Sequence, residues 1–207
     1  MFLLNIVLPV VRCFSRTISE IKSKLRFEKF KRKVVLKGQR YNIMPGAQVL
    51  FEYGSTLGDI ELGEYVTIYG TLFSQSHGKI IMGDYTRLGF NSCIRAVEKV
   101  YIGNYTAIAN DVVITDNDNH PIDPVFRRKM KEDTLGGEMR AWHNSAHSEI
   151  VIGENVWVGE KSRIQKGVHI GDNSIIAAGS IVTHDIPANC IAAGIPAKVI
   201  KYIGDGK

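Results

Sequence analysis

The chain has 207 residues, of which 44% are hydrophobic and 23% are charged. This length and composition exclude a disordered chain and predict one soluble globular body with a sizeable core. The net charge of +5 is uneven, because residues 1–40 hold eleven Lys or Arg and only two Glu. The net charge of the remaining residues is −4. The basic charge therefore belongs to the N-terminal segment and does not indicate a nucleic-acid-binding body.

The first predicted element is this basic amphipathic segment, residues 1–40. Its opening, FLLNIVLPVV, is apolar for about ten residues, whereas a membrane-spanning helix needs roughly 20, and no basic stretch precedes it as in a signal peptide. We therefore expect neither a transmembrane helix nor a signal peptide.

The following residues of the segment place Ile18, Ile21 and Leu25, with Phe30 or Val34, near one helical face among Lys and Arg. Two interpretations stay open. The segment either lies peripherally on the inner face of an anionic membrane or caps the open end of the domain that follows.

Residues 41–201 repeat with a period of six. At each step an aliphatic residue precedes a glycine or another small residue, and a small or β-branched residue follows four positions later. The aliphatic positions are Met82, Leu88, Ile102, Ile108, Ile152, Val158, Ile164, Ile170, Ile176 and Val182. The period fits neither a helix nor one long alternating strand. Since residues i and i+4 share one face of an extended segment, the pattern predicts short strands, regular corners and three sides to a coil.

The predicted fold class is therefore all-β, a parallel β-solenoid with an inner column of stacked Ile and Val. Corner glycines such as Gly83 and Gly103 are expected to supply a permissive backbone. The spacing from Leu62 to Met82, and from there to Ile102, is twenty residues, which predicts two-residue insertions at corners. A β-sandwich with chance alternation would need irregularly spaced hairpin loops and fits the fixed step poorly.

The largest interruption of the repeat is an inserted loop, residues 120–149. It follows the stretch VVITDNDNHPIDP, where a cluster of Asp and Asn leads to His120 and Pro121. A long insertion in a regular solenoid favours a functional loop, with a solvated flexible loop as the alternative. Residues 202–207 form a C-terminal tail.

Three cysteines, Cys13, Cys93 and Cys190, are too few and too separated for a disulfide framework or a cysteine-based zinc site. A reducing compartment is expected, which favours a cytoplasmic location.

The block IVIGENVWVGEKSRIQKGVHIGDNSIIAAGSIVTHDIPANCIAAGIPAKVI resembles the C-terminal half of the hexapeptide-repeat acyltransferases. It is similar to galactoside and maltose O-acetyltransferases and to bacterial polysaccharide O-acetyltransferases, over roughly residues 80–201. The resemblance implies a left-handed parallel β-helix, acetyl-CoA as the donor, and a homotrimer with active sites between subunits. The hand comes from the resemblance alone, because parallel crossovers are usually right-handed.

Acetyl transfer to an alcohol needs a base for the hydroxyl proton and donors for the oxyanion that forms on the thioester carbonyl. The resemblance places the catalytic histidine at His120, and histidine suits this role because it titrates near neutral pH. A surface turn histidine is the alternative. Asp116 and Asp118 are candidates for orienting the imidazole, although turn chemistry explains both equally well.

The resemblance also implies residues for the acceptor. Asn91 matches an acceptor-binding asparagine, with a plain corner residue as the alternative. Trp157 matches a tryptophan near the acceptor site, where an indole face packs well against a sugar. Trp142 is either a second platform or the anchor of the inserted loop. Because galactoside acetyltransferase has a different N-terminal segment, the preferred acceptor is a sugar or lipid-linked glycan of surface polysaccharide biosynthesis.

For the donor, Ala178 and Thr183 match positions whose backbone amides line the CoA groove. Glu160 stands where the family has a serine whose amide serves the thioester oxygen, so its side-chain charge is a departure. Lys198 and Lys201 replace two arginines near the CoA phosphates, which lysine neutralises as a point charge. A solvated basic tail is the alternative for these two lysines.

Other activities occur on the same kind of solenoid. A zinc carbonic anhydrase would need histidines near Glu160 and Gln165, so no metal is expected, although His143 and His147 have a spacing that suits zinc on a helix. An antibiotic O-acetyltransferase and a non-enzymatic scaffold are the remaining alternatives. Assays with drug acceptors and with a His120 variant separate them.

Overall fold

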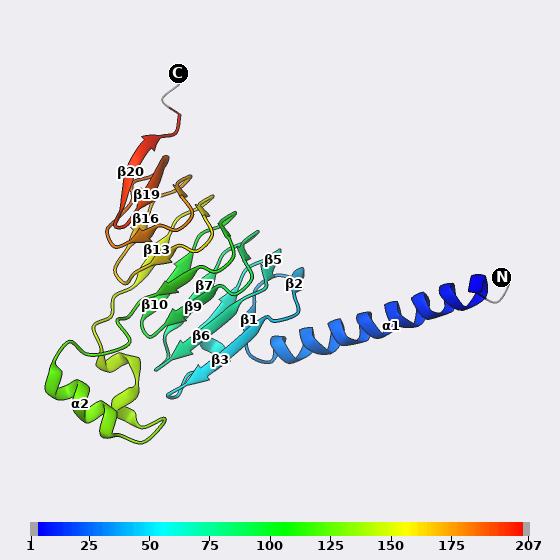
Figure 1. The fold of residues 1–207 in the computed structure, drawn as a ribbon, viewed down its shortest axis with the longest axis horizontal. Helices are drawn as coiled ribbons and strands as arrows, with labels where there is room; N and C mark the ends of the chain where they lie inside the picture. Colours follow the sequence, from blue (N-terminus) through cyan, green and yellow to red (C-terminus); the bar gives the residue numbers. More distant parts are fainter. Residues whose placement is uncertain (1–3, 205–207) are drawn as a thin grey trace.

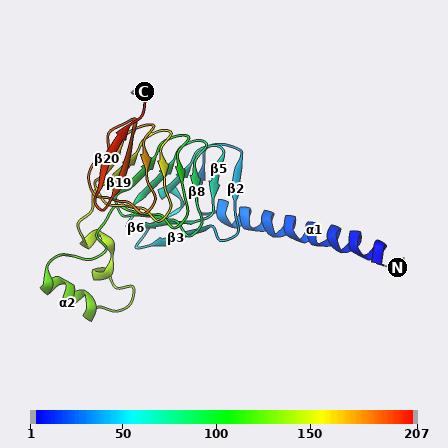
Figure 2. The same ribbon diagram turned by 45° about the horizontal axis from the view of Figure 1, so that its top comes forward.

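The computed structural model describes the backbone of residues 4–204 and the side chains of residues 18–204. It is a left-handed parallel β-helix with three sides, and α1 (Leu4–Lys31) leads away from its first coil (Figures 1 and 2). The fold class predicted from the period of six is confirmed. No helix in the described part of the chain has the length and apolar character to cross a bilayer.

Three sheets form the sides, and each takes one strand from each successive coil. Sheet A contains, in spatial order, β1 (Val35–Leu36), β4 (Ile60–Leu62), β7 (Lys79–Met82), β10 (Lys99–Ile102), β13 (Ile150–Ile152) and β16 (His169–Ile170). Sheet B contains β2 (Tyr41–Ile43), β5 (Val66–Ile68), β8 (Arg87–Leu88), β11 (Ala107–Ile108), β14 (Trp157–Val158), β17 (Ile175–Ile176), β19 (Cys190–Gly194) and β20 (Ala197–Tyr202). Sheet C contains β3 (Gln48–Glu52), β6 (Thr71–Gln75), β9 (Cys93–Ala96), β12 (Val113–Thr115), β15 (Arg163–Ile164) and β18 (Ile181–Val182).

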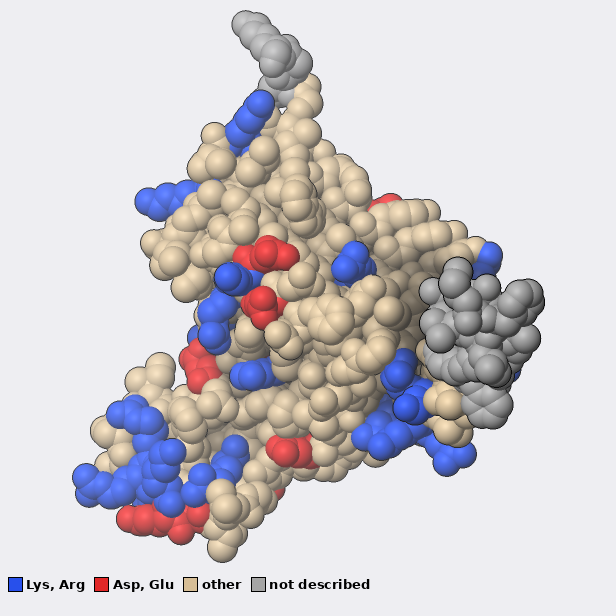
Figure 3. Space-filling view, turned by 45° about the vertical axis from the view of Figure 1, so that its right-hand side comes forward, with Lys and Arg blue, Asp and Glu red and all other residues tan. Residues whose placement is uncertain are grey.

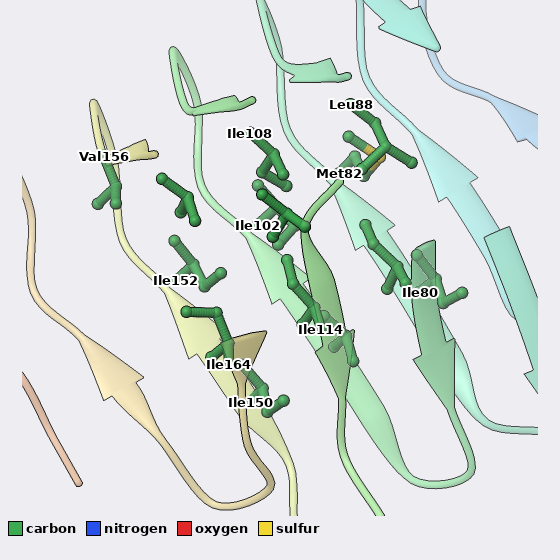
Figure 4. Packing of buried hydrophobic residues seen from close by; sticks show 14 of the residues in the cluster. Ile80, Met82, Leu88, Ile102, Ile108, Ile114, Ile150, Ile152, Val156 and Ile164 are labelled. Carbon is green, nitrogen blue, oxygen red and sulfur yellow. The ribbon is translucent and has the colours of Figure 1, made fainter. Parts of the chain in front are cut away.

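The strand registers stack the predicted aliphatic positions on one another. In sheet A, the partners in successive strands are Leu62, Met82, Ile102, Ile152 and Ile170. All five are buried, and Figure 4 shows part of the resulting inner column. Because a two- or three-residue strand is too short to be stable alone, each coil depends on burial against the coils above and below it.

The small residues four positions later are also interior, and their hydroxyl groups satisfy corner carbonyls. Thr106 Oγ1 donates to the carbonyl of Gly153 at 2.8 Å, and Ser92 Oγ donates to that of Ala109 at 2.7 Å. Both side chains are buried. A small polar residue therefore fits these corners without leaving an unsatisfied group.

The corner glycines are required for a reason other than the one expected from the sequence. A Cβ on Gly83 would lie 2.9 Å from the amide nitrogen of Asn104 in the next coil, and one on Gly103 would lie 2.7 Å from that of Glu154. The left-handed backbone comes two residues later, as at Tyr85 with φ 56°. The expectation of a permissive φ at these glycines is wrong, because it is the close approach of the next coil that excludes a side chain.

Extra chain length collects at the corner between sheets C and A. The step across it from Ile94 to Ile102 is eight residues, which confirms the predicted two-residue insertion. The long insertion leaves the same corner and runs from residue 116 to residue 149, so it begins four residues earlier than predicted. It holds α2 (Pro124–Glu132) and two 3-10 helices, η2 (Glu138–Arg140) and η3 (Trp142–Asn144), beside the solenoid (Figure 1). A third 3-10 helix, η1 (Leu57–Asp59), precedes β4.

The N-terminal segment divides into two parts. Phe30 and Val34 are buried in the core, and β1 pairs with β4, so the solenoid begins before residue 41. The part of α1 near Ile18 does not join this core and is exposed. The side chains of FLLNIVLPVV and of Cys13 lie outside the described residues, as do residues 205–207 of the predicted tail.

Candidate active site

The inserted segment begins at Asp116, whose side chain is fully buried. Its carboxylate accepts hydrogen bonds from the N–H of Val97 at 3.0 Å and of Glu98 at 2.8 Å, in the same corner one coil earlier. Its carbonyl accepts the N–H of Ser148 at 2.9 Å, so both ends of the insertion meet at this residue. Burial raises the pKa of Asp116, and hydrogen bonds from Asn117 and from backbone amides offset part of the rise.

His120 lies four residues further along, and its side chain is exposed. Its N–H donates to the carbonyl of Asp118 at 2.7 Å, and Asn119 is left-handed with φ 64°, so the chain turns sharply just before Pro121. The imidazole has no hydrogen-bond or ion-pair partner among the described residues. It is available to a molecule that approaches from outside the chain.

Neither candidate carboxylate bonds to His120 within this chain. Asp116 is directed back into the coil, as described above. Asp118 Oδ1 accepts from Lys166 Nζ at 2.7 Å, which links the insertion to the next coil. An orienting role for either Asp therefore stays a prediction. The sequence reasoning missed Lys166, and the available signal was its place at the same corner one coil after the interruption.

Asn91, Glu160 and Ala178 occupy the edge between sheets B and C. Glu160 and Ala178 belong to adjacent coils, and one further coil separates them from Asn91. The carbonyl of Glu160 accepts the N–H of Gly179 at 2.7 Å, and its side chain accepts from Asn110 at 3.0 Å. The N–H groups of Glu160 and Ala178 have no acceptor among the described residues. Uncommitted amides at this edge are suitable donors for an oxyanion.

Trp157 lies beside this edge, because β14 ends at the following residue. Trp157 is 56% exposed, so part of its side chain is open to a ligand. His120 and Thr183 belong to the other edge, between sheets C and A. Within one chain, sheet C therefore separates the predicted base from Trp157 and Asn91.

Trp142 anchors the insertion. Trp142 is only 7% exposed, and its ring centroid lies 4.6 Å from that of Phe73. Its backbone N–H donates to Gln75 Oε1 at 3.1 Å. Of the two roles that the sequence left open, this geometry favours the anchor, because an indole this covered has little face to offer a sugar.

Lys198 and Lys201 lie on β20, the last strand of the hairpin with β19, and both side chains are exposed. They stand at the C-terminal end of the solenoid, in the same sheet as Trp157. Their ammonium groups are available to phosphate there.

The two histidines with a helical spacing have different partners. His143 contacts Ser76 Oγ at 2.9 Å and Glu138 at 3.2 Å, whereas His147 contacts Glu98 at 3.0 Å. Only the first of them lies in a 3-10 helix. The described residues contain no group of three His, Cys, Asp or Glu side chains placed to hold a metal ion.

Comparison with known proteins agrees with this architecture. The family model described as bacterial transferase hexapeptide (six repeats) matches residues 149–184. WbbJ from Escherichia coli (strain K12), for which an O-acetyl transferase role in lipopolysaccharide biosynthesis has been proposed, is 34% identical over 149 residues. That match covers 70% of this chain and 72% of WbbJ. The chain belongs to the hexapeptide-repeat acyltransferase family.

This hexapeptide-repeat protein is also 40% identical over 116 residues to the galactoside O-acetyltransferase of Escherichia coli (strain K12). The match covers 56% of this chain and 57% of that protein's length. Among solved structures, an N-acyltransferase from Bacillus cereus, AntD, in complex with coenzyme A and dTDP-4-amino-4,6-dideoxyglucose, superimposes with a TM-score of 0.66 at 19% identity. That superposition covers 87% of this chain and 89% of AntD, and it shows a shared fold.

Proposed function

We propose that this protein transfers an acetyl group from acetyl-CoA to a sugar hydroxyl, with His120 as the general base. The observation that carries the proposal is an exposed, unpartnered imidazole held in a sharp turn on a solenoid edge. Membership of a family whose relatives include named O-acetyltransferases supports the same reaction.

In the proposed reaction, His120 accepts the proton of the acceptor hydroxyl as the oxygen attacks the thioester carbonyl. The oxyanion accepts hydrogen bonds from free backbone N–H groups, for which Glu160 and Ala178 are the candidates. As the oxyanion collapses, the carbon–sulfur bond breaks, and His120 returns its proton to the CoA thiolate. Thr183, Lys198 and Lys201 are proposed to contact CoA, with the two lysines at its phosphates.

A homotrimer is proposed because the candidate residues lie on two edges of one chain. A three-fold arrangement would place the edge that carries His120 beside the edge of a neighbour that carries Asn91 and Trp157. The acceptor would then lie between subunits.

The proposed acceptor is a glycan of surface polysaccharide biosynthesis, either free or lipid-linked. The match to WbbJ supports this class, because it extends over more than two thirds of both chains. A lipid-linked acceptor would place the enzyme at the inner face of the membrane. The role of the basic N-terminal segment would then be to contact anionic lipid headgroups.

The test is release of CoA thiol from acetyl-CoA in the presence of glycan acceptors. The His120→Ala variant is expected to lower kcat by roughly 10²–10⁴-fold, the usual contribution of a general base, with little change in KM for acetyl-CoA. His169→Ala is the matched control, since His169 is another exposed histidine but lies on sheet A. Equal turnover by the wild type and by His120→Ala would contradict the assignment of the base.

A further inference from the structure

The exposed part of α1 presents an apolar stripe. Ile18, Ile21 and Leu25 are 45%, 51% and 66% exposed, although large aliphatic side chains are usually buried. Their spacing of three and four residues places them on one helical face. The helix leads away from the solenoid, so the body of the chain does not cover them (Figures 1 and 2).

At its C-terminal end, by contrast, α1 packs against the solenoid. Phe30 is 5% exposed, Phe27 is half-buried, and the ring centroids of Phe27 and Tyr41 lie 6.3 Å apart. Lys33 Nζ donates to the carbonyl of Val49 at 2.8 Å and holds this end on β3. The helix therefore caps the solenoid with its C-terminal end, and the stripe has no partner among the side chains of residues 18–204.

Cationic side chains surround the stripe. Residues 18–40 contain nine Lys or Arg against Glu20 and Glu28. Lys22, Lys24 and Lys29 lie along α1 and are exposed. Figure 3 shows Lys and Arg gathered where α1 joins the solenoid. An apolar face flanked by lysines is typical of helices that lie on anionic membranes.

A groove between α1 and β3 adds a place for a phosphate group. Its volume is about 450 Å³, and its lining includes Arg26 and Lys29 from the helix, Lys33 from the turn that follows it, and no acidic residue. The bond from Lys33 to Val49 uses one of three ammonium donors, so two stay available. Three cations on one wall would neutralise a bound phosphate.

We propose that α1 is a membrane-surface helix that binds anionic phospholipid. Ile18, Ile21 and Leu25 enter the boundary between headgroups and acyl chains, and the groove with Arg26, Lys29 and Lys33 receives a headgroup phosphate. The membrane location rests on the proposed function, whereas lipid binding is measured without any acetyl transfer.

Association with α1 of a second copy is the rival explanation of the stripe. Positions 18, 21 and 25 fit the core spacing of a coiled coil, but Lys22, Lys24 and Lys29 would then flank the seam. Parallel copies would bring Lys24 of one helix close to Lys29 of the next, and like charges at such positions are destabilising. The charge pattern therefore favours an anionic surface over another basic helix.

The experiment is co-sedimentation of the full chain with vesicles of phosphatidylcholine, alone or mixed with phosphatidylglycerol. We expect binding to the mixed vesicles only. Ile21→Ser with Leu25→Ser should weaken it more than roughly tenfold, because apolar burial drives interfacial binding. The matched control, Ile195→Ser with Ile200→Ser, removes two exposed isoleucines at the other end of the molecule and should bind normally.

A second pair of variants tests the groove. Arg26→Gln, Lys29→Gln and Lys33→Gln together should weaken binding to mixed vesicles by on the order of a hundredfold. Arg128→Gln, Lys129→Gln and Lys131→Gln remove the same charge from α2 and should have little effect. Equal weakening by both sets would overturn the groove as a specific site.

Two outcomes would overturn the whole inference. One is that the wild type does not bind mixed vesicles. The other is that the variant at Ile21 and Leu25 loses oligomer mass by light scattering, with vesicle binding intact, which would indicate contact between copies. Acetyl transfer to a soluble glycan is measured on the same samples. If acetyl transfer is absent while vesicle binding is normal, the proposed function is refuted and the proposed lipid-binding site is retained.

Discussion

Two aspartates, two positions apart, have different environments. Asp116 is fully buried, and its carboxylate accepts the backbone N–H groups of Val97 and Glu98. Asp118 is partly exposed and pairs with Lys166, a kind of contact that contributes little in water. A buried amide that loses its acceptor retains its full desolvation cost. Asp116 therefore holds the chain that leads to His120, whereas Asp118 is more replaceable.

We predict that Asp116→Ala lowers the unfolding free energy by about 1–3 kcal/mol, because the amides that it caps lose their acceptor. Asp118→Ala should cost less than about 1 kcal/mol. Urea denaturation of both variants measures the difference. Similar values for the two would show that the hydrogen bonds of Asp116 do not hold the insertion.

The destabilisation caused by Asp116→Ala is predicted to depend on pH. Burial raises the pKa of Asp116 above its ordinary value of 3.8, so the folded protein holds this proton more tightly than the unfolded chain does. Stability from this group is fully present below the unfolded pKa and declines as the pH rises towards the folded pKa. The cost of Asp116→Ala is therefore expected to be larger at about pH 4 than at about pH 7. The opposite trend would contradict the direction of the shift.

At the scale of elements, each strand has an inward and an outward side. In β7, Ile80 is fully buried in the column, whereas Ile81 points outward and is half-buried. Both residues are isoleucines, and they occupy adjacent positions in the same strand. They differ in whether the side chain points into the interior of the solenoid or away from it, since the strands of the adjacent coils flank both residues.

Ile80→Ala is expected to lower the unfolding free energy by about 2–5 kcal/mol, through lost burial and the cavity that remains. Ile81→Ala is the matched control and should cost clearly less, because its side chain is already partly in water. Chemical denaturation of both variants gives the comparison. Equal costs would mean that stability does not reside in the inner column.

At the scale of the molecule, the two groups of candidate residues lie on different edges. His120 and Thr183 lie between sheets C and A, and Asn91 and Glu160 lie between sheets B and C. Sheet C spans the distance between them in one chain. A site that uses both groups therefore needs a neighbouring subunit.

Subunit mixing tests this arrangement. His120→Ala and Asn91→Ala are each expected to lower acetyl transfer strongly as pure proteins. If the site takes His120 from one subunit and Asn91 from another, co-expression should restore about a quarter of the sites in random mixed trimers. The measurement is CoA release by the purified mixture. A mixture no more active than its components would place both residues in one subunit.

Much of the fold could be predicted from the sequence, because the repeat that builds the solenoid is a local pattern along the chain. The six-residue step at Ile152, Val158 and Ile164 follows from side-chain direction in a strand and needs no distant contact. The insertion was visible for the same reason, as a break in the step. The insertion starts at Asp116, four residues before the predicted start, because the contacts of the Asp116 carboxylate with Val97 and Glu98 in the preceding coil leave no local sequence pattern.

The sequence by itself determined the period, the approximate position of the insertion and the presence of His120 near its start, since each is a matter of spacing along the chain. Only the tertiary structure decided that Trp142 is covered by Phe73, that Phe30 caps the solenoid while Leu25 stays exposed, and that sheet C separates the candidate residues. These facts depend on which surfaces meet across many residues. Whether a side chain is buried depends on these tertiary contacts, and the pattern of residues along the chain does not specify them.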